Sequence, residues 1–159
     1  MSTPQLFPGY CIDTSALIDL WRRLYPPDIF PSLWKEIDKL YAQGELIAPR
    51  EVLKELEQKD DELLKWASKH RKMFKKLDYD QVNKVRNILS RFQNLVDVNK
   101  TIPEADPFVI ALALSKGWTL ITSEKLGSSG HPKIPDVCTH YGVKCINLIE
   151  FFREQKWEF

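Results

Sequence analysis

Four acidic residues each stand where a short apolar segment meets a turn or the start of a helix, although they lie far apart in the sequence. They are Asp13, Glu55, Asp106 and Glu124. The carboxyl ends of parallel strands meet at one edge of a sheet, so side chains placed there are expected to converge. Because converging carboxylates repel one another unless a cation lies between them, the pattern predicts a divalent-metal site.

The chemistry predicted for such a site is hydrolysis by metal-activated water. Mg²⁺ and Mn²⁺ are hard cations that prefer carboxylate and water oxygens as ligands. One or two such ions can polarise a phosphodiester and lower the pKa of a bound water. No histidine or cysteine nucleophile is then required.

Each of the four acids also has a local explanation. Asp13 is of a type that caps the N-terminus of a helix, and we expect Asp106 at an N-cap with Pro107 in the first helical position. Glu55 is expected on a helix whose surface carries other charged residues, and Glu124 fits a solvated turn. Only the combination of the four favours a shared site.

The surrounding sequence predicts strands that alternate with helices. Strands are expected at residues 10–12, 46–48, 118–121 and 143–147. Helices are expected at residues 15–21, from 31 to the glycine at 44, through 51–56, twice within 58–97, from 106 to the glycine at 117, and at 149–153. Such alternation is typical of an α/β fold with a mostly parallel central sheet.

The composition is that of one globular domain. A chain of 159 residues is long enough for a sizeable core, and its 43% of hydrophobic residues excludes wholesale disorder. The net charge is +1, so any polyanion has to be bound by a local patch. No segment approaches the length of a membrane span, and we expect the three cysteines to be free thiols. We therefore expect a cytoplasmic protein.

Four segments of the chain resemble the PIN-domain superfamily of metal-dependent nucleases, which includes the VapC-type toxins. The segments are Cys11–Ile18, Ala48–Leu56, Glu104–Ala113 and Leu120–Glu124, and they follow the order of the family. Tyr25–Pro27 and Lys133–Cys138 are similar to a PIN-like prokaryotic branch of unassigned function. The resemblance implies a single three-layer α/β/α PIN-like domain over residues 1–159.

The resemblance also implies catalytic and metal-binding roles for the four acids, with Mg²⁺ or Mn²⁺ as the cofactor. Ser15 and Thr122 match positions where the family carries polar residues beside the metal site. Glu124 stands where the family usually has aspartate, and its extra methylene moves the carboxylate outward. Glu124 could therefore act on the metal through water.

Residues 65–76 contain six Lys or Arg residues and no acid. Interleaved with Trp66 and Phe74, these cations could bind a phosphate backbone while the aromatics stack on unpaired bases. The candidate nucleic-acid contacts are Lys69, Arg71, Lys72 and Lys75. The alternative, which we favour, is an amphipathic helix whose aromatics face the core and whose cations face water. The segment could equally contact an acidic partner protein.

These observations together predict a Mg²⁺- or Mn²⁺-dependent endoribonuclease that hydrolyses RNA phosphodiesters. The resemblance implies the toxin of a type II toxin–antitoxin pair, with an antitoxin protein and a second copy of the chain as partners. Two alternatives stay open. One is a catalytically weak or inactive PIN-like module that binds RNA or a protein, and the other is a nuclease acting on DNA flaps or junctions.

Overall fold

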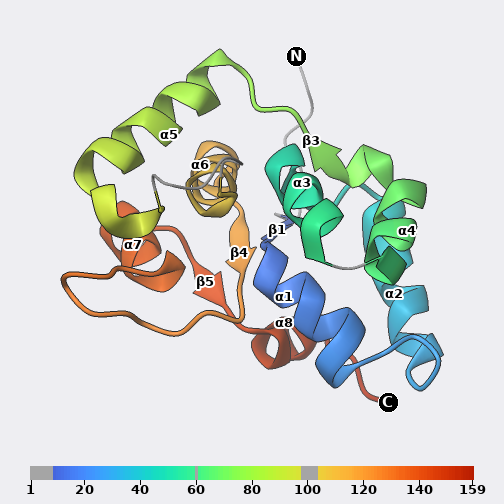
Figure 1. Cartoon of the computed structure of the whole chain (residues 1–159). Coiled ribbons are helices and arrows are strands. Elements are labelled where there is room, and N and C mark those ends of the chain that lie inside the picture. The colour runs from blue at the N-terminus through green and yellow to red at the C-terminus, as the bar shows by residue number, and fades with distance from the viewer. Residues whose placement is uncertain (1–8, 60, 98–103) are drawn as a thin grey trace, which may run out of the picture.

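A five-stranded parallel sheet forms the middle layer of the protein (Figure 1). The computed structural model describes residues 9–59, 61–97 and 104–159. The strand order is β3-β2-β1-β4-β5. The strands are β1 Tyr10–Ile12, β2 Leu46–Pro49, β3 Phe74–Lys75, β4 Thr119–Ile121 and β5 Cys145–Ile146. Helices cover both faces, so the predicted α/β class and its three-layer arrangement are confirmed.

The helices divide between the two faces of the sheet. The first face is covered by α1 Thr14–Ile18, α2 Pro31–Ala42, α3 Arg50–Lys59, α4 Asp61–Lys69 and α8 Leu148–Glu154 (Figure 1). The second face is covered by α5 Tyr79–Arg91, α6 Asp106–Lys116 and α7 Ile134–Tyr141. Shorter turns are the π-helical η1 Asp19–Leu24 and the 3₁₀ turns η2 Arg71–Met73 and η3 Gln93–Leu95.

Successive residues of the strands enter two separate hydrophobic cores. In β1, Tyr10 and Ile12 pack under the first face, whereas Cys11 packs under the second. In β4, Ile121 and Leu120 divide in the same way. Side chains alternate between the two faces of a strand, so a strand buried on both faces is apolar at every position. Within the described ranges, no helix is both long and apolar enough to cross a bilayer.

Helices α6 and α7 both end on a glycine with a left-handed backbone. Gly117 has a φ of 67° and Gly142 a φ of 71°. The residues that follow donate their N–H groups to carbonyls of the last helical turn, Trp118 to Ala113 and Val143 to Cys138. This arrangement satisfies otherwise unpaired carbonyls and turns the chain directly into the next strand. The amino edge of the sheet is therefore where these helices end.

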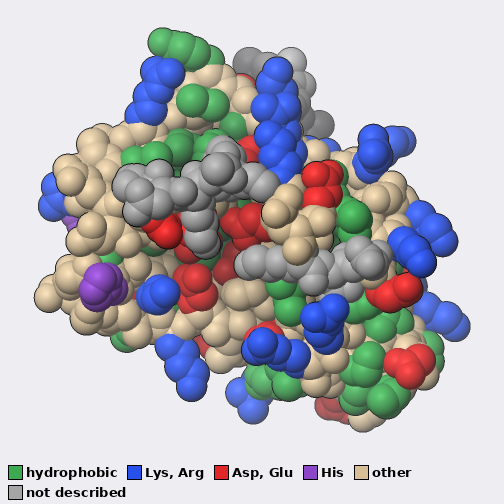
Figure 2. Space-filling model, in the orientation of Figure 1, with side chains coloured by type: hydrophobic (Ala, Val, Ile, Leu, Met, Phe, Trp, Pro, Cys, Tyr) green, Lys and Arg blue, Asp and Glu red, His purple; other side chains and the backbone are tan. Residues whose placement is uncertain are grey.

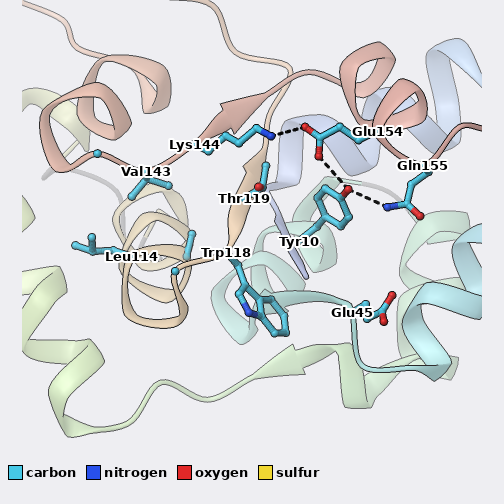
Figure 3. A pocket seen from close by; sticks show the side chains of 12 residues that line it. Tyr10, Glu45, Leu114, Trp118, Thr119, Val143, Lys144, Glu154 and Gln155 are labelled. Carbon is cyan, nitrogen blue, oxygen red and sulfur yellow. Dashed lines mark hydrogen bonds and ion pairs between the residues drawn. The ribbon is translucent and has the colours of Figure 1, made fainter. Parts of the chain in front are cut away.

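A cavity of about 690 Å³ lies at the amino edge of the sheet (Figure 3). The Tyr10 hydroxyl donates to Glu154 Oε1 at 3.0 Å and accepts from Gln155 Nε2 at 2.8 Å. Lys144 Nζ forms an ion pair with Glu154 Oε2 at 2.7 Å. These contacts tie the end of α8 to β1 and to the residue before β5. They lie at the sheet edge opposite to the carboxyl ends of the strands, where the four acids are expected.

Two elements differ from the sequence-based expectation. Strand β3 lies inside the stretch predicted to hold only two helices, and it pairs Phe74 with Ala48 and Lys75 with Pro49. A two-residue strand is too short to show a periodic pattern of its own. Helix α7 was not predicted, and it buries Ile134, Val137 and Cys138 against the second face of the sheet.

Candidate functional site

Asp13 lies directly after β1 and caps the N-terminus of α1. Its backbone N–H donates to the Ile121 carbonyl at 3.1 Å, which continues the pairing of β1 with β4. Its Oδ1 accepts the N–H of Ala16 at 2.8 Å, so the capping explanation is correct for this residue. The side chain is only 2% exposed, which makes Asp13 an almost fully buried carboxyl group.

Two hydroxyl groups hold the Asp13 carboxylate from the side. Thr122 Oγ1 donates to Asp13 Oδ2 at 2.6 Å, and Ser15 Oγ donates to the same oxygen at 2.9 Å. Thr122 Oγ1 also accepts the N–H of Glu124 at 3.0 Å, and Ser15 Oγ accepts the N–H of Ser123 at 3.2 Å. Both supporting polar residues expected from the sequence therefore lie beside Asp13, where they join α1 to the chain after β4.

Glu55 reaches from α3 to the start of α6. Its Oε1 accepts the N–H of Ala105 in a short hydrogen bond of 2.5 Å. Ala105 immediately precedes the first residue of α6 and occupies its N-cap position. Glu55 therefore supplies from another helix the acceptor that a side chain at the N-cap would supply. The side chain of Glu55 is half-buried, so an exposed position on the helix surface does not account for it.

Glu124 makes the corresponding contact with α7. Its Oε2 accepts the N–H of Ile134, the first residue of α7, at 3.0 Å. The side chain is half-buried, so the turn that holds it is not simply a solvated one. Through the Thr122 hydroxyl, which accepts the N–H of Glu124, this contact connects the N-terminus of α7 to Asp13.

Asp106 is the acid that the surrounding structure satisfies least. We expected it at the N-cap of α6, but the helix begins at Asp106 itself, with Ala105 at the cap. Ala105 carries no side-chain acceptor, so the N-cap residue of α6 does not itself satisfy the free amides of the helix. Among the described residues, none donates a hydrogen bond to the half-buried Asp106 carboxylate.

The other three acids all lie within electrostatic range of Asp106. Burial and, in decreasing order, the nearby charges of Glu124, Asp13 and Glu55 together raise the pKa of Asp106 to about 8. Burial also raises the pKa of Asp13 to about 7, although the hydrogen bonds from Thr122, Ala16 and Ser15 lower it. The four acids therefore lie in one region of the structure, with Asp106 under the electrostatic influence of the other three. Near neutral pH the site holds protons in addition to negative charge.

Three helix N-termini offset part of the negative charge at this site. The starts of α1, α6 and α7 direct backbone N–H groups at Asp13, Glu55 and Glu124 respectively. The positive end of a helix macrodipole stabilises a carboxylate placed there. On the side of the molecule shown in Figure 2, acidic side chains gather near the middle and Lys and Arg side chains lie around the periphery.

The four carboxylates fit a hard divalent cation by donor type. Glu55 and Glu124 each commit one oxygen to a helix amide, which leaves the second oxygen to face a ligand. As the side chains stand, no three His, Cys, Asp or Glu residues in the described parts of the chain are close enough to hold one metal ion. Binding of Mg²⁺ or Mn²⁺ would therefore require side-chain rotation that draws the carboxylates together.

Glu104 is an acid near the site for which sequence reasoning assigned no role. Its charge adds to those that raise the pKa of Asp106. One oxygen of its carboxylate accepts the N–H of Asp97 at 3.2 Å. The available signal was its position two residues before Asp106 in a segment already identified as part of the site.

The predicted nucleic-acid contacts lie on the surface, from the end of α4 through η2 into β3. Lys69, at the end of α4, and Lys75, in β3, have exposed side chains, as do Arg71 and Lys72 between them. The aromatic residues of this segment face inward. Phe74 is buried, and the half-buried Trp66 packs in the first core. The favoured expectation of inward aromatics and outward cations is thus confirmed, although the helix ends at Lys69 and the chain continues as η2 and β3.

The raised pKa values predict a stability that falls as pH rises. A carboxyl whose folded pKa lies above its unfolded value keeps an extra proton in the folded state, and that advantage is lost as pH rises from about 4 through 8. We expect the free energy of unfolding without divalent metal to fall by up to about 1.4 kcal/mol per pH unit for each extra proton. Urea denaturation across this range measures it. Asp106→Asn should flatten the slope, and an unchanged slope in that variant would contradict the assignment.

Thr122 is predicted to contribute to stability through its hydroxyl group. Thr122→Val keeps the shape but removes the donor to Asp13 and the acceptor for the Glu124 N–H. Leaving these buried groups unpaired should cost about 1–3 kcal/mol, and Thr122→Ser should restore most of it. Thermal unfolding at pH 8 distinguishes the two variants. Equal melting temperatures for the Thr122→Val and Thr122→Ser variants would show that the hydroxyl group does not contribute to stability.

Comparison with known proteins identifies the family of the chain. No curated protein matches the chain. Residues 10–159 match the model of the family described as Domain of unknown function (DUF4411). This match includes all five strands and all four acids of the site, and the chain belongs to that family.

Proposed function

We propose that the protein is a divalent-metal-dependent endoribonuclease of the PIN type, in which water attacks an RNA phosphodiester. One observation carries the proposal. Asp13, Glu55 and Glu124, which come from three distant parts of the sequence, all lie within electrostatic range of Asp106 at the carboxyl edge of a parallel sheet. This edge is where open α/β sheets bind their ligands.

The four acids differ in the hydrogen bonds that they accept. Asp13 is fixed by two hydroxyls and one amide, and Asp106 receives no hydrogen bond from a described residue. Glu55 and Glu124 are each oriented by a helix amide, as metal-binding carboxylates commonly are. A bound Mg²⁺ or Mn²⁺ would supply a water of lowered pKa and stabilise the charge that develops on the leaving oxygen. In the proposal, Asp13 and Asp106 bind this ion and the two glutamates complete its surroundings.

The biological role that we propose is that of a toxin in a type II toxin–antitoxin pair. This rests on the resemblance of the four acidic segments to VapC-type proteins. An antitoxin protein and a second copy of the chain are the partners that such a role implies. The decisive observation is a neighbouring gene that encodes a small DNA-binding protein.

One observation favours a second candidate, a PIN-like module that binds RNA or a protein without cutting. Glu55 and Glu124 already accept hydrogen bonds from the N-termini of α6 and α7. No three acids in the described part of the chain stand close enough to share an ion. If holding these helices were the only role of the glutamates, the site would need no metal.

RNA cleavage tests the catalytic proposal directly. With Mn²⁺ present, the protein should cut RNA, and Asp13→Asn or Asp106→Asn should lower the rate on the order of 100-fold or more, because each removes charge that stabilises the transition state. Asp80→Asn, an exposed position on α5, is the matched control and should cut normally. Parallel assays on DNA flaps and junctions identify a DNA nuclease. Full activity in both site variants would refute the assignment of the acids.

Calorimetric titration with Mn²⁺ separates the enzyme from the inactive module. An ion that binds between carboxyls of raised pKa must displace protons, so Mn²⁺ binding should tighten as pH rises from 6 to 8. The measured heat should also depend on the ionisation enthalpy of the buffer. Asp106→Asn should remove most of this binding, whereas Asp80→Asn should not. Absence of carboxylate-dependent binding would favour the inactive module.

A further inference from the structure

Five exposed cations form a continuous segment along the outer edge of the sheet. We define the basic strip as Lys69, Arg71, Lys72, Lys75 and Lys76. Within the described part of the chain, no member of the strip has an ion-pair partner, whereas Lys65 nearby is paired with Glu62 at 3.2 Å. Residues 65–76 carry a charge of +6 and the whole chain +1, so the rest of the chain carries −5. This charge separation makes the strip the natural contact for a polyanion.

The strand register places Lys75 of the strip level with the acidic site. Lys75 in β3 pairs with Pro49, the last residue of β2. Continuing the β1–β2 register, in which Cys11 pairs with Ile47, brings Asp13 level with the same Pro49. Neighbouring strands lie about 4.8 Å apart, so Lys75 and Asp13 are level along the strands and about 10 Å apart across the sheet. A short stretch of extended nucleic acid spans that distance.

Helix α3 connects the two regions. It begins immediately after Pro49 and packs against β3, and it carries Glu55 into the acidic site. The strip runs from the end of α4 through η2 to Lys75, so a strand of nucleic acid that lies along it reaches the carboxyl edge, where the acids stand, at Lys75.

The strip offers charge but no aromatic surface. Phe74 is 8% exposed, and Trp66 is held among other rings, 5.3 Å from Trp34 and stacked on His70 at 4.2 Å between ring centroids. Phe74 therefore offers no ring to a base, and one face of the Trp66 ring is already occupied by His70. Contacts made by lysine and arginine to phosphates carry no sequence information.

We propose that the basic strip binds the sugar-phosphate backbone of a single-stranded nucleic acid and directs that strand into the acidic site, independently of base sequence. That the bound strand continues into the acidic site rests on the proposed function, whereas binding of the strand at the strip does not. Lysines on an edge strand also prevent edge-to-edge pairing of sheets, and this simpler role predicts no binding.

Salt dependence of binding tests the proposal. Fluorescence anisotropy of labelled oligouridylate is measured without divalent metal in the Asp106→Asn chain, which leaves the strand intact. Each phosphate contact to a single strand contributes about −0.7 to the slope of log affinity against log salt. Lys75→Gln combined with Lys76→Gln should make the slope shallower by about 1.4. The advantage of the unmodified strip should therefore shrink about sevenfold between about 50 and 200 mM salt.

The matched control neutralises two exposed cations at the opposite end of the sheet. Arg153→Gln combined with Lys156→Gln, at and beyond the end of α8, should leave the slope unchanged. Oligouridylate and an oligodeoxynucleotide of mixed sequence should lose affinity in parallel when the strip is neutralised. A slope that is the same in both double variants would overturn the proposal, as would binding of polyglutamate without binding of either oligonucleotide. Loss of slope in a chain that never cuts RNA would uphold the strip and refute the proposed function.

Discussion

Four carboxyl groups can lie together inside a protein only if their mutual repulsion is offset. Here the offset comes from the N-termini of three helices, whose amides meet Asp13, Glu55 and Glu124. Asp106 has no such donor among the described residues, and its pKa rises to about 8. The site therefore contains three carboxylates that accept helix amides and one, that of Asp106, that accepts none from the described residues. A proton or a cation is the simplest way to neutralise Asp106, whose carboxylate accepts no hydrogen bond from a described residue.

The acidic site and the contacts that hold the helix ends lie at opposite edges of the sheet. Parallel strands connected by helices put helix starts at the carboxyl edge and helix ends at the amino edge. At the amino edge, Gly117 and Gly142 complete the helix ends, and the Tyr10, Glu154 and Lys144 side chains satisfy one another. At the carboxyl edge, no donor to Asp106 is found among the residues that the structure describes. The polar side chains named at the amino edge have hydrogen-bond partners within the protein. The Asp106 carboxylate, at the edge where a ligand would bind, accepts none from the described residues.

The two glutamates connect the site to the second layer of helices. Glu55 lies in a helix of the first face but bonds the start of α6, which belongs to the second. Glu124 bonds the start of α7, and its own N–H is held by the Thr122 hydroxyl that also donates to Asp13. The longer side chain at position 124, where the resembling family usually has aspartate, is used in this contact. Rotation of Glu55 or Glu124 towards a cation would therefore break its hydrogen bond to the start of α6 or α7, the helices that cover the second face.

Much of the fold was predictable from local patterns. The apolar segments around Cys11, Ile47 and Leu120 were correctly predicted to be buried strands, and the glycine at 117 correctly marked the end of α6. Strand β3 was not predictable, because two residues contain no periodicity and pairing with Ala48 and Pro49 is a long-range event. The cap of α6 was misplaced by one residue, because the amide in question is satisfied by Glu55 from a distant helix rather than by a neighbour.

The sequence by itself determined the alternation of elements, the two buried faces of the strands and the identity of the four acids, because each of these is written in local spacing and side-chain type. Only the tertiary structure decided which amide each glutamate meets, that Asp106 meets none from the described residues, and that Lys75 stands level with Asp13. The physical reason is that hydrogen-bond partners and electrostatic neighbours depend on distance in space. That distance is set by strand register and helix packing between segments far apart in the chain.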